Sequence, residues 1–209
     1  ESGETLGIIG PSAAGKTSLA RAILGVWPLR TGTVRLDGAD ISKWDRDKLG
    51  PHLGYLPQDI ELFDGTIAKN ICRFSEEDSQ KIVEASQKAG VHEMILALPE
   101  GYDTVINSYS GSLSAGQRQR VGLARAIYGN PKLIVLDEPN SNLDDQGEND
   151  LLAALSQMKG SGSTIIVITH RTSILSLVDK LMILKDGMIA RFGSRDDVLQ
   201  ALNSKSPNV

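Results

Sequence analysis

Cysteine and long apolar runs are nearly absent from this sequence. Its one cysteine, Cys72, has no partner for a disulfide within the 209 residues, so we expect a reducing compartment and a small, buried, apolar role for this thiol. No apolar run approaches the roughly 18 residues of a membrane span, and no basic stretch followed by an apolar one marks a secretory leader. By itself, the chain is therefore expected to be neither secreted nor membrane-spanning.

Positive charge does not predominate, because 22 Lys and Arg stand against 26 Asp and Glu. The formal net charge is −4 and the pI is near 5.4, which disfavours non-specific electrostatic binding to nucleic acid. No nucleic-acid partner is therefore expected. With 40% apolar and 23% charged residues the chain is not a disordered polyelectrolyte, and it is long enough to bury one core. Glycine, by contrast, is frequent at 21 residues, which predicts tight turns or close approaches of the backbone to a ligand.

Short apolar runs alternate with segments of helical period, which predicts one α/β domain over residues 1–209, with a mainly parallel sheet and antiparallel parts. The middle of the chain, about 75–130, has helical periodicity and no convincing strand, so we expect a helical subdomain inserted into the α/β core. The predicted strands are Thr5–Ile9, Thr33–Leu36, Gly54–Leu56, Leu133–Leu136, Thr164–Thr169, Leu181–Leu184 and Met188–Phe192. The predicted helices are Lys16–Leu24, one that starts at Ser75 with Asp78, Val91–Leu98, and Ser114 to about Tyr128.

The chain begins without methionine and enters a strand pattern at Thr5. A natural domain often has some lead-in before its first core strand. We therefore expect the sequence to be a piece of a longer protein, truncated on its N-terminal side.

The segment Gly10–Thr17 fits the pattern G-x-x-x-x-G-K-[ST], directly after a predicted strand and at the start of a predicted helix. Its glycines let the backbone wrap a phosphate, and inward-pointing amides bind that phosphate at the positive end of the helix. Lys16 would reach the β- and γ-phosphates, and the Thr17 hydroxyl would hold Mg²⁺. A glycine-rich turn with an exposed lysine is the plain structural alternative. The predicted nucleotide-binding residues are Gly10, Pro11, Ser12, Ala13, Ala14, Gly15, Lys16, Thr17 and Ser18.

Two carboxylates, Asp137 and Glu138, follow the apolar run Leu133–Leu136. A carboxylate at the C-terminal end of a core strand stands where ligands bind in such sheets. Asp137 would reach the Mg²⁺, and Glu138 would accept a proton from the attacking water. Alone, the pair also fits a solvated strand end.

A second candidate anion site lies at Leu113–Gln117, where Ser114 and Gln117 have the spacing of a capping box at a helix start. One chain does not need two such sites for one triphosphate, but two chains meeting head to tail would. An ordinary capped helix remains the alternative.

The chain resembles the ATPase cassette of ABC transporters over nearly its whole length, with six motifs in that family's order. The phosphate loop, the strand carboxylates and Leu113–Gln117 match three of them. Gln58 matches the glutamine loop, Asp144 in Ser141–Asp144 the D-loop, and His170 the switch histidine. By this resemblance the catalytic residues are Lys16, Gln58, Glu138 and His170; the nucleotide also contacts Gln58, Ser114, Gly116, Gln117, Asp144 and His170; the metal ligands are Thr17, Gln58 and Asp137.

The resemblance implies ATP and Mg²⁺ as cofactors and a two-fold homodimer that sandwiches two ATP molecules. Ser114 and Gly116 of one copy would then touch the γ-phosphate held by Lys16 of the other. Donors from both copies would meet the charge that develops on the phosphate oxygens. Because each copy would complete the other's site, hydrolysis is expected to depend on the dimer.

The segments 37–44, 56–67 and 99–106 resemble exporter cassettes, most of all those of type I protein secretion in Gram-negative bacteria. There, the cassette follows six membrane-spanning helices in the same polypeptide, on the cytoplasmic face of the inner membrane. The whole exporter works with a membrane-fusion protein and an outer-membrane channel. These partners and this location are implied by the resemblance alone.

The sequence departs from the exporter pattern in two places. The loop before the signature, Asn107–Ser112, lacks the glutamate that exporters usually carry there. The aromatic residue that stacks on adenine lies in the family on a strand upstream of the phosphate loop, before the start of this sequence. We therefore expect this chain to bind ATP more weakly than a longer one that includes that strand.

Other functions stay open. The cassette could power an exporter of lipids or drugs, because the cargo path lies in the membrane domain. It could belong to a soluble ABC protein acting on DNA or ribosomes, although the sequence has no long coiled-coil insertion and no second cassette. A P-loop kinase would need a lid rich in arginine. A cassette that only binds ATP is disfavoured because Lys16, Asp137, Glu138 and His170 are all present.

Overall fold

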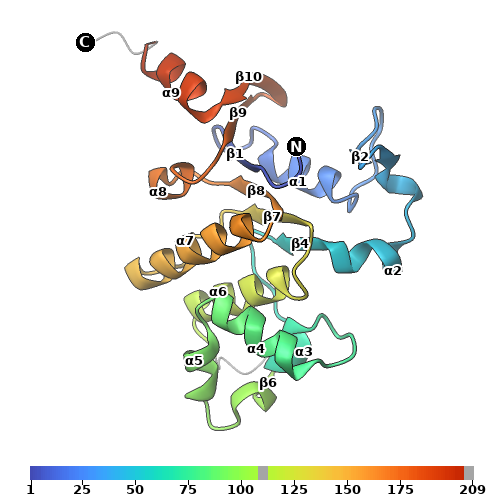
Figure 1. The fold of residues 1–209 in the computed structure, drawn as a ribbon, viewed down its shortest axis with the longest axis vertical. Coiled ribbons are helices and arrows are strands. Elements are labelled where there is room, and N and C mark those ends of the chain that lie inside the picture. Colours follow the sequence, from blue (N-terminus) through green and yellow to red (C-terminus); the bar gives the residue numbers. More distant parts are fainter. Residues whose placement is uncertain (108–112, 205–209) are drawn as a thin grey trace.

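The computed structural model describes residues 1–107 and 113–204 (Figure 1). A six-stranded sheet, in the order β10-β9-β1-β8-β7-β4, runs through the upper part of the molecule. Its β10–β9 pair is antiparallel and its other four pairs are parallel. The predicted mainly parallel α/β architecture is confirmed. The strands of this sheet are β1 Thr5–Ile9, β4 Leu53–Leu56, β7 Leu133–Asp137, β8 Thr164–Ile168, β9 Lys180–Lys185 and β10 Met188–Ser194.

The inner strands β1, β8 and β7 are largely buried on both faces, which explains why they are almost wholly apolar. In β7, Leu133 and Val135 pack on the face covered by α1, whereas Ile134 and Leu136 pack on the face covered by α6 and α7. The helices are α1 Lys16–Ile23, α2 Arg46–Leu49, α3 Ile67–Ile71, α4 Ser79–Lys88, α5 His92–Leu96, α6 Ala115–Ile127, α7 Asp145–Gly160, α8 Thr172–Leu175 and α9 Arg195–Asn203, with short 3-10 turns η1 Ile41–Lys43, η2 Gly50–His52 and η3 Gly101–Asp103.

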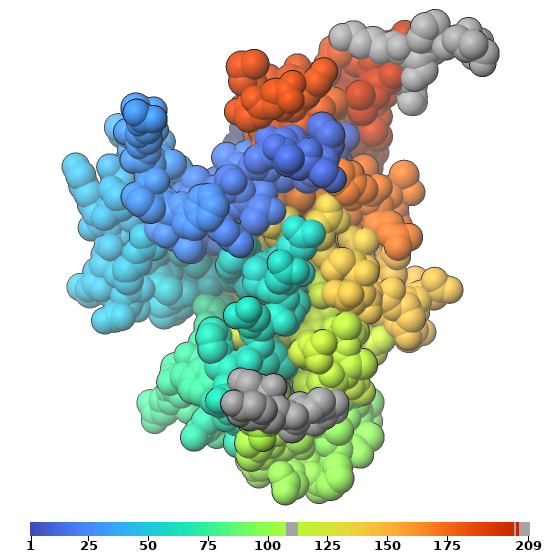
Figure 2. Space-filling view, turned by 180° about the vertical axis from the view of Figure 1, so that it is seen from behind, coloured from blue at the N-terminus to red at the C-terminus, as the bar shows by residue number. Residues whose placement is uncertain are grey.

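Helices α3 to α6 gather below the sheet (Figure 1), and in the view from behind their green surface forms the lower end of the molecule (Figure 2). Their side chains join the core through Cys72, which is fully buried as expected, and through Ile82 and Val121. Two short antiparallel pairs complete the fold: the hairpin of β2 Arg35–Leu36 with β3 Ala39–Asp40, and β5 Gly65–Thr66 with β6 Val105–Ile106, which is distant in the sequence.

Two expectations about the middle of the chain were wrong. The segment contains a strand, β6, which pairs antiparallel with β5; a two-residue pairing leaves no periodicity in the sequence. The first helix begins at Ser79 rather than Ser75, because the Asp78 carboxylate accepts a hydrogen bond from Lys81 N at 3.1 Å and caps the helix.

None of the helices in the described ranges is both long and apolar enough to cross a membrane. The expectation about the loop before the signature falls mostly on residues 108–112, which lie outside the described residues.

Candidate functional site

Four parallel strands bring the predicted residues to one edge of the sheet. The register aligns Ile8 with Ile168, Asp137 with Ile168, and Leu56 with Leu136, so β1, β8, β7 and β4 all end along the same line. The segments that follow these strands carry, in that spatial order, the phosphate loop, His170, Glu138 and Gln58. Parts of the sequence more than a hundred residues apart thus form one row at the C-terminal edge, where ligands bind in open α/β sheets.

The phosphate loop has a backbone that only small residues tolerate. At Gly10, a Cβ atom would lie 2.1 Å from Leu184 O, so any other residue would clash with β9. Gly15 caps the start of α1 in the left-handed region, and Ala13 is also left-handed, with φ of 62°. The Lys16 ammonium donates to Gly10 O at 2.7 Å and to Pro11 O at 3.0 Å. The lysine side chain therefore folds back over the phosphate loop, and its ammonium group lies beside the main-chain carbonyls of that loop.

Asp137 is 1% exposed, and neither of its carboxylate oxygens has a hydrogen-bond partner. Burial raises the pKa of Asp137, and the Asp59 charge adds to the rise, while the Thr17 hydroxyl and the charges of Lys16 and Arg21 oppose it. A buried carboxylate without a partner is costly unless a cation or donor completes it. Oxygen ligands are those that Mg²⁺ prefers, so Asp137 with Thr17 fits this ion.

In the described part of the chain, no group of three or more His, Cys, Asp or Glu side chains converges. A phosphate group and water would supply further ligands, as is usual for Mg²⁺ at phosphate sites. Gln58, the third predicted ligand, is exposed two residues beyond β4.

Replacing Asp137 by asparagine is expected to stabilise the nucleotide-free protein by about 1 kcal/mol at pH 7, because it removes a buried charge that Thr17, Lys16 and Arg21 compensate only in part. The pKa of this acid is raised in the fold, so the folded state binds its proton more readily than the unfolded state does. The stability gap between variant and wild type should therefore shrink as pH falls from 7 through the raised pKa. Urea unfolding at several pH values measures it, with the exposed Asp103→Asn as control; a destabilised Asp137→Asn would contradict the argument.

Glu138 and His170 form a pair at the centre of the row. His170 Nε2 lies 3.2 Å from Glu138 Oε1, and the glutamate side chain is 19% exposed. Burial raises the pKa of Glu138, and Asp137 adds to the rise, while His170 and Lys16 lower it. The Glu138 backbone is left-handed (φ 50°) and its N–H donates to Ile168 O at 2.9 Å. Held in this sparsely populated conformation, the carboxylate faces the histidine instead of following the strand.

The start of α6 is capped by its own side chains. Ser114 Oγ accepts from Gln117 N at 3.2 Å, and Gln117 Oε1 accepts from Ser114 N at 2.8 Å, which completes the predicted capping box. Gly116 packs against the backbone, since a Cβ there would lie 2.8 Å from Asn142 O. Within the described ranges, no hydrogen bond or ion pair joins residues 114–117 to the phosphate loop.

Asp144 caps helix α7 within the single chain. Its Oδ1 accepts from Gly147 N at 2.9 Å, capping α7, and from Arg120 Nη2 at 2.9 Å. The hydrogen bond from Gly147 lowers the pKa of Asp144, with Arg120 adding to it. The side chain is 72% exposed, so the cap also leaves it open to a partner.

Sequence reasoning missed the buried polar groups behind the row. Gln119 is fully buried and donates from Nε2 to Pro139 O at 2.9 Å, which ties α6 to the segment after Glu138. Thr169 Oγ1 donates to Asn140 Oδ1 at 3.0 Å and links the ends of β8 and β7. The only sequence signal was that these polar residues interrupt segments that are otherwise buried.

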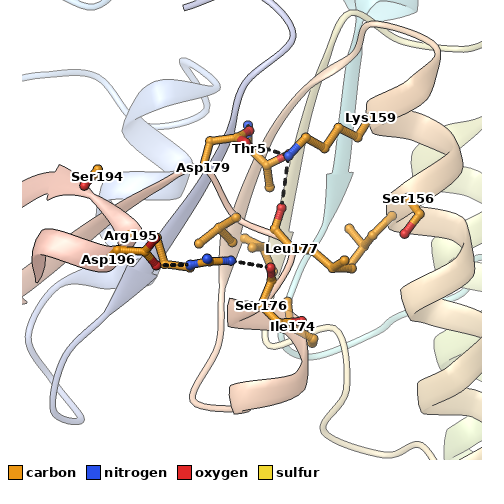
Figure 3. Close-up of a pocket in the computed structure, with 13 residues that line it drawn as sticks. Thr5, Ser156, Lys159, Ile174, Ser176, Leu177, Asp179, Ser194, Arg195 and Asp196 are labelled. Carbon is orange, nitrogen blue, oxygen red and sulfur yellow. Dashed lines mark hydrogen bonds and ion pairs between the residues drawn. The ribbon is translucent and has the colours of Figure 1, made fainter. Parts of the chain in front are cut away.

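A separate cavity of about 450 Å³ lies near the start of β1, at the other edge of the sheet (Figure 3). Its charged groups are paired: Lys159 Nζ lies 2.6 Å from Asp179 Oδ1, and Arg195 Nε lies 2.8 Å from Asp196 Oδ1. None of the predicted site residues lines it. The row at the C-terminal edge is therefore the candidate site.

Comparison with known proteins identifies relatives over most of the chain. The model of the ABC transporter family matches residues 1–141. The type I secretion system ATP-binding protein PrsD of Rhizobium meliloti (strain 1021) is 56% identical over 198 residues, which are 94% of this chain and 34% of that protein. The ATP-dependent lipid A-core flippase of Saccharophagus degradans is 35% identical over 200 residues, 95% of this chain and 34% of that protein.

A solved structure supports the same relationship. A bacterial Atm1-family ABC exporter with ATP bound superimposes with a TM-score of 0.86 and 34% sequence identity, covering 95% of this chain and 35% of that one. The chain thus spans about a third of the length of these relatives.

Proposed function

The chain belongs to the ABC transporter family, and from that membership we propose that it is the ATP-binding and ATP-hydrolysing domain of an exporter for type I protein secretion. The observation that carries the ATPase part is the row of Lys16, Asp137 and Glu138 with His170 at one sheet edge. The similarity to PrsD supports the type I secretion part. Residues 75–130 would act in it as a helical subdomain inserted into the α/β core.

ATP would bind with its phosphates in the loop Gly10–Thr17. The Lys16 ammonium would exchange its bonds to Gly10 O and Pro11 O for oxygens of the β- and γ-phosphates. Thr17 and Asp137, with Gln58, would hold Mg²⁺, which when bound neutralises charge on the phosphates. Free backbone amides at the start of α1 would bind the remaining phosphate oxygens.

Glu138 would take a proton from the water that attacks the γ-phosphorus, while the bond to the β–γ bridging oxygen breaks and ADP leaves. Its raised pKa suits this role, since a base works best when its pKa approaches the ambient pH. His170, 3.2 Å away, would hold the carboxylate and donate to the phosphate. These roles give ATP hydrolysis to ADP and phosphate.

A second copy would complete each site. Ser114, Gly116 and Gln117 make no hydrogen bond to the phosphate loop of the same chain within the described residues, and the amides of Ala115 and Gly116 have no intrahelical acceptor. A head-to-tail homodimer would bring them, with Asp144, to the ATP on the partner. Because both copies contact each nucleotide, binding would close the dimer and hydrolysis would open it.

The membrane domain would contact an exposed aromatic pair beside the Gln58 loop. Phe63 and Phe74 are 58% and 50% exposed and meet edge-to-face with centroids 6.0 Å apart. The Arg125 guanidinium lies 5.6 Å from the Phe63 ring. We place this surface against a transmembrane domain of the same polypeptide, at the cytoplasmic face of the bacterial inner membrane. A membrane-fusion protein and an outer-membrane channel would complete the exporter, and no nucleic acid takes part.

The secretion proposal is tested by deleting the gene for the complete protein in its source organism and comparing the culture supernatants. We expect specific extracellular proteins to disappear, to return with the wild-type gene, and to stay absent with a Glu138→Gln gene. An unchanged set of secreted proteins would contradict the proposal. A change in outer-membrane lipid instead would favour the lipid exporter, which the similarity to the lipid A-core flippase keeps as second candidate.

A further inference from the structure

Arg73 lies just beyond α3, in a backbone turn that directs its side chain toward α6 and β4. Arg73 and Phe74 both have left-handed conformations, with φ of 60° and 58°, which residues other than glycine seldom adopt. Phe74 N donates to Lys69 O at 2.9 Å and closes the turn. Such strain persists only where the surrounding contacts fix it, and those contacts are made by the guanidinium.

The guanidinium has no carboxylate partner in the described part of the chain and binds main-chain carbonyls instead. Its five N–H groups are enough for five such bonds. Nε donates to Arg125 O (3.0 Å), Nη1 to Gly50 O (3.1 Å) and Leu53 O (2.7 Å), and Nη2 to Ala126 O (3.0 Å) and Tyr128 O (3.4 Å). Burial of the group and the neighbouring Arg125 lower the pKa of Arg73, which remains a cation at neutral pH.

These carbonyls belong to α6 with its C-cap, to η2 and to β4. Arg125 and Ala126 lie in the last turn of α6, where carbonyls have no intrahelical donor and the helix carries partial negative charge. Gly50 begins η2 and Leu53 begins β4, which follows it directly. The two backbones also touch directly, because a Cβ at Gly54 would lie 2.2 Å from Ala126 O. The C-terminal end of α6 is thus fixed to the edge strand of the sheet.

The other end of α6 carries Ser114 and Gly116. The helix has 13 residues, so its start lies about 20 Å from the fixed end, and a tilt of roughly 5° moves it by about 2 Å. A displacement of that size breaks hydrogen bonds to a phosphate. We propose that Arg73 is a positioning residue that sets the direction in which α6 presents Ser114 and Gly116 to the nucleotide on the partner copy. This inference rests on the proposed ATP-sandwich dimer.

The test uses the complete transporter, purified in lipid nanodiscs, with Arg73→Gln and Arg73→Lys. We expect Arg73→Gln to lower kcat for ATP at least tenfold while the Kd for ATP without Mg²⁺ stays within twofold. Arg73→Lys keeps the positive charge but has fewer N–H donors, so its kcat should lie between those of the wild type and Arg73→Gln. A second readout is the ATP-dependent disulfide between Ser12→Cys on one copy and Ser114→Cys on the other, which should form at least tenfold more slowly with Arg73→Gln.

Arg195→Gln is the matched control, because Arg195 also donates to a carbonyl at a helix end, Ser176 O, but on the far part of the sheet. It should leave kcat and the disulfide rate unchanged. Unchanged kcat and disulfide rate in both Arg73 variants would overturn the inference, as would a loss of ATP affinity in parallel with thermal stability. A wild-type transporter with neither ATPase activity nor the ATP-dependent disulfide would instead overturn the proposed function.

Discussion

Replacing Lys16 by alanine is expected to lower the affinity for ATP at least 100-fold, about 3 kcal/mol. The ammonium lies directly over the phosphate loop, 2.7 Å from Gly10 O and 3.0 Å from Pro11 O, and it is the charge that the loop offers to the phosphates. Backbone amides alone would remain to bind three phosphate groups. Equilibrium binding of ATP, with and without Mg²⁺, measures the loss.

The fold itself should survive this change. The two carbonyls that Lys16 binds lie in a solvent-accessible loop and can bond water instead, so the free energy of unfolding should change by less than about 1 kcal/mol. Lys132→Ala is the control, because it removes an equal charge just before β7, at the opposite edge of the sheet. Equal ATP affinity of Lys16→Ala and wild type would refute the assignment of the phosphate loop.

Lys16, Asp137 and Glu138 could be found from the sequence because each follows a strongly marked strand, whereas Gln58 and His170 were assigned from the resemblance to ABC cassettes. Runs such as Leu133–Leu136 and Thr164–Thr169 predict buried parallel strands, and parallel strands deliver their C-terminal ends to one edge. Glycines at fixed spacing before Lys16 predict the phosphate loop because the backbone there needs positive φ and close approach. The roles of these residues in catalysis remain predictions.

Features without local patterning were not predicted. The longest helix, α7, has consecutive apolar residues at 151–155 rather than a spaced stripe, and no helix was expected there. Strand β6 owes its existence to a partner 40 residues earlier in the chain, β5. The contacts of Arg73 depend on two residues with left-handed backbone conformations and on main-chain carbonyls from three segments. Every residue has such a carbonyl, so the pattern of side chains along the sequence does not predict these contacts.

Replacing Glu138 by glutamine is expected to lower kcat for ATP hydrolysis by about 10³, within the range that general bases contribute. The amide is nearly the same size and keeps a contact to His170, now 3.2 Å from the carboxylate, but it cannot accept the proton of the attacking water. ATP affinity should be retained, because Glu138 does not belong to the phosphate loop. The protein should then accumulate as an ATP-bound dimer, visible by light scattering at saturating Mg²⁺ and ATP.

The pH dependence distinguishes a base from a merely structural carboxylate. Burial raises the pKa of Glu138, and only its deprotonated form accepts a proton, so wild-type kcat should fall as pH decreases through that raised pKa. The residual rate of Glu138→Gln should lack this acid limb, whereas the exposed Glu77→Gln should keep both the rate and the limb of the wild type. A Glu138→Gln protein that hydrolyses ATP within tenfold of the wild-type rate would remove Glu138 from the mechanism. If the Glu138→Gln variant is slow but its rate still falls at the same acid pH, a group other than Glu138 causes the pH dependence. Asp137, the neighbouring carboxyl group whose pKa is also raised, would then be the first candidate.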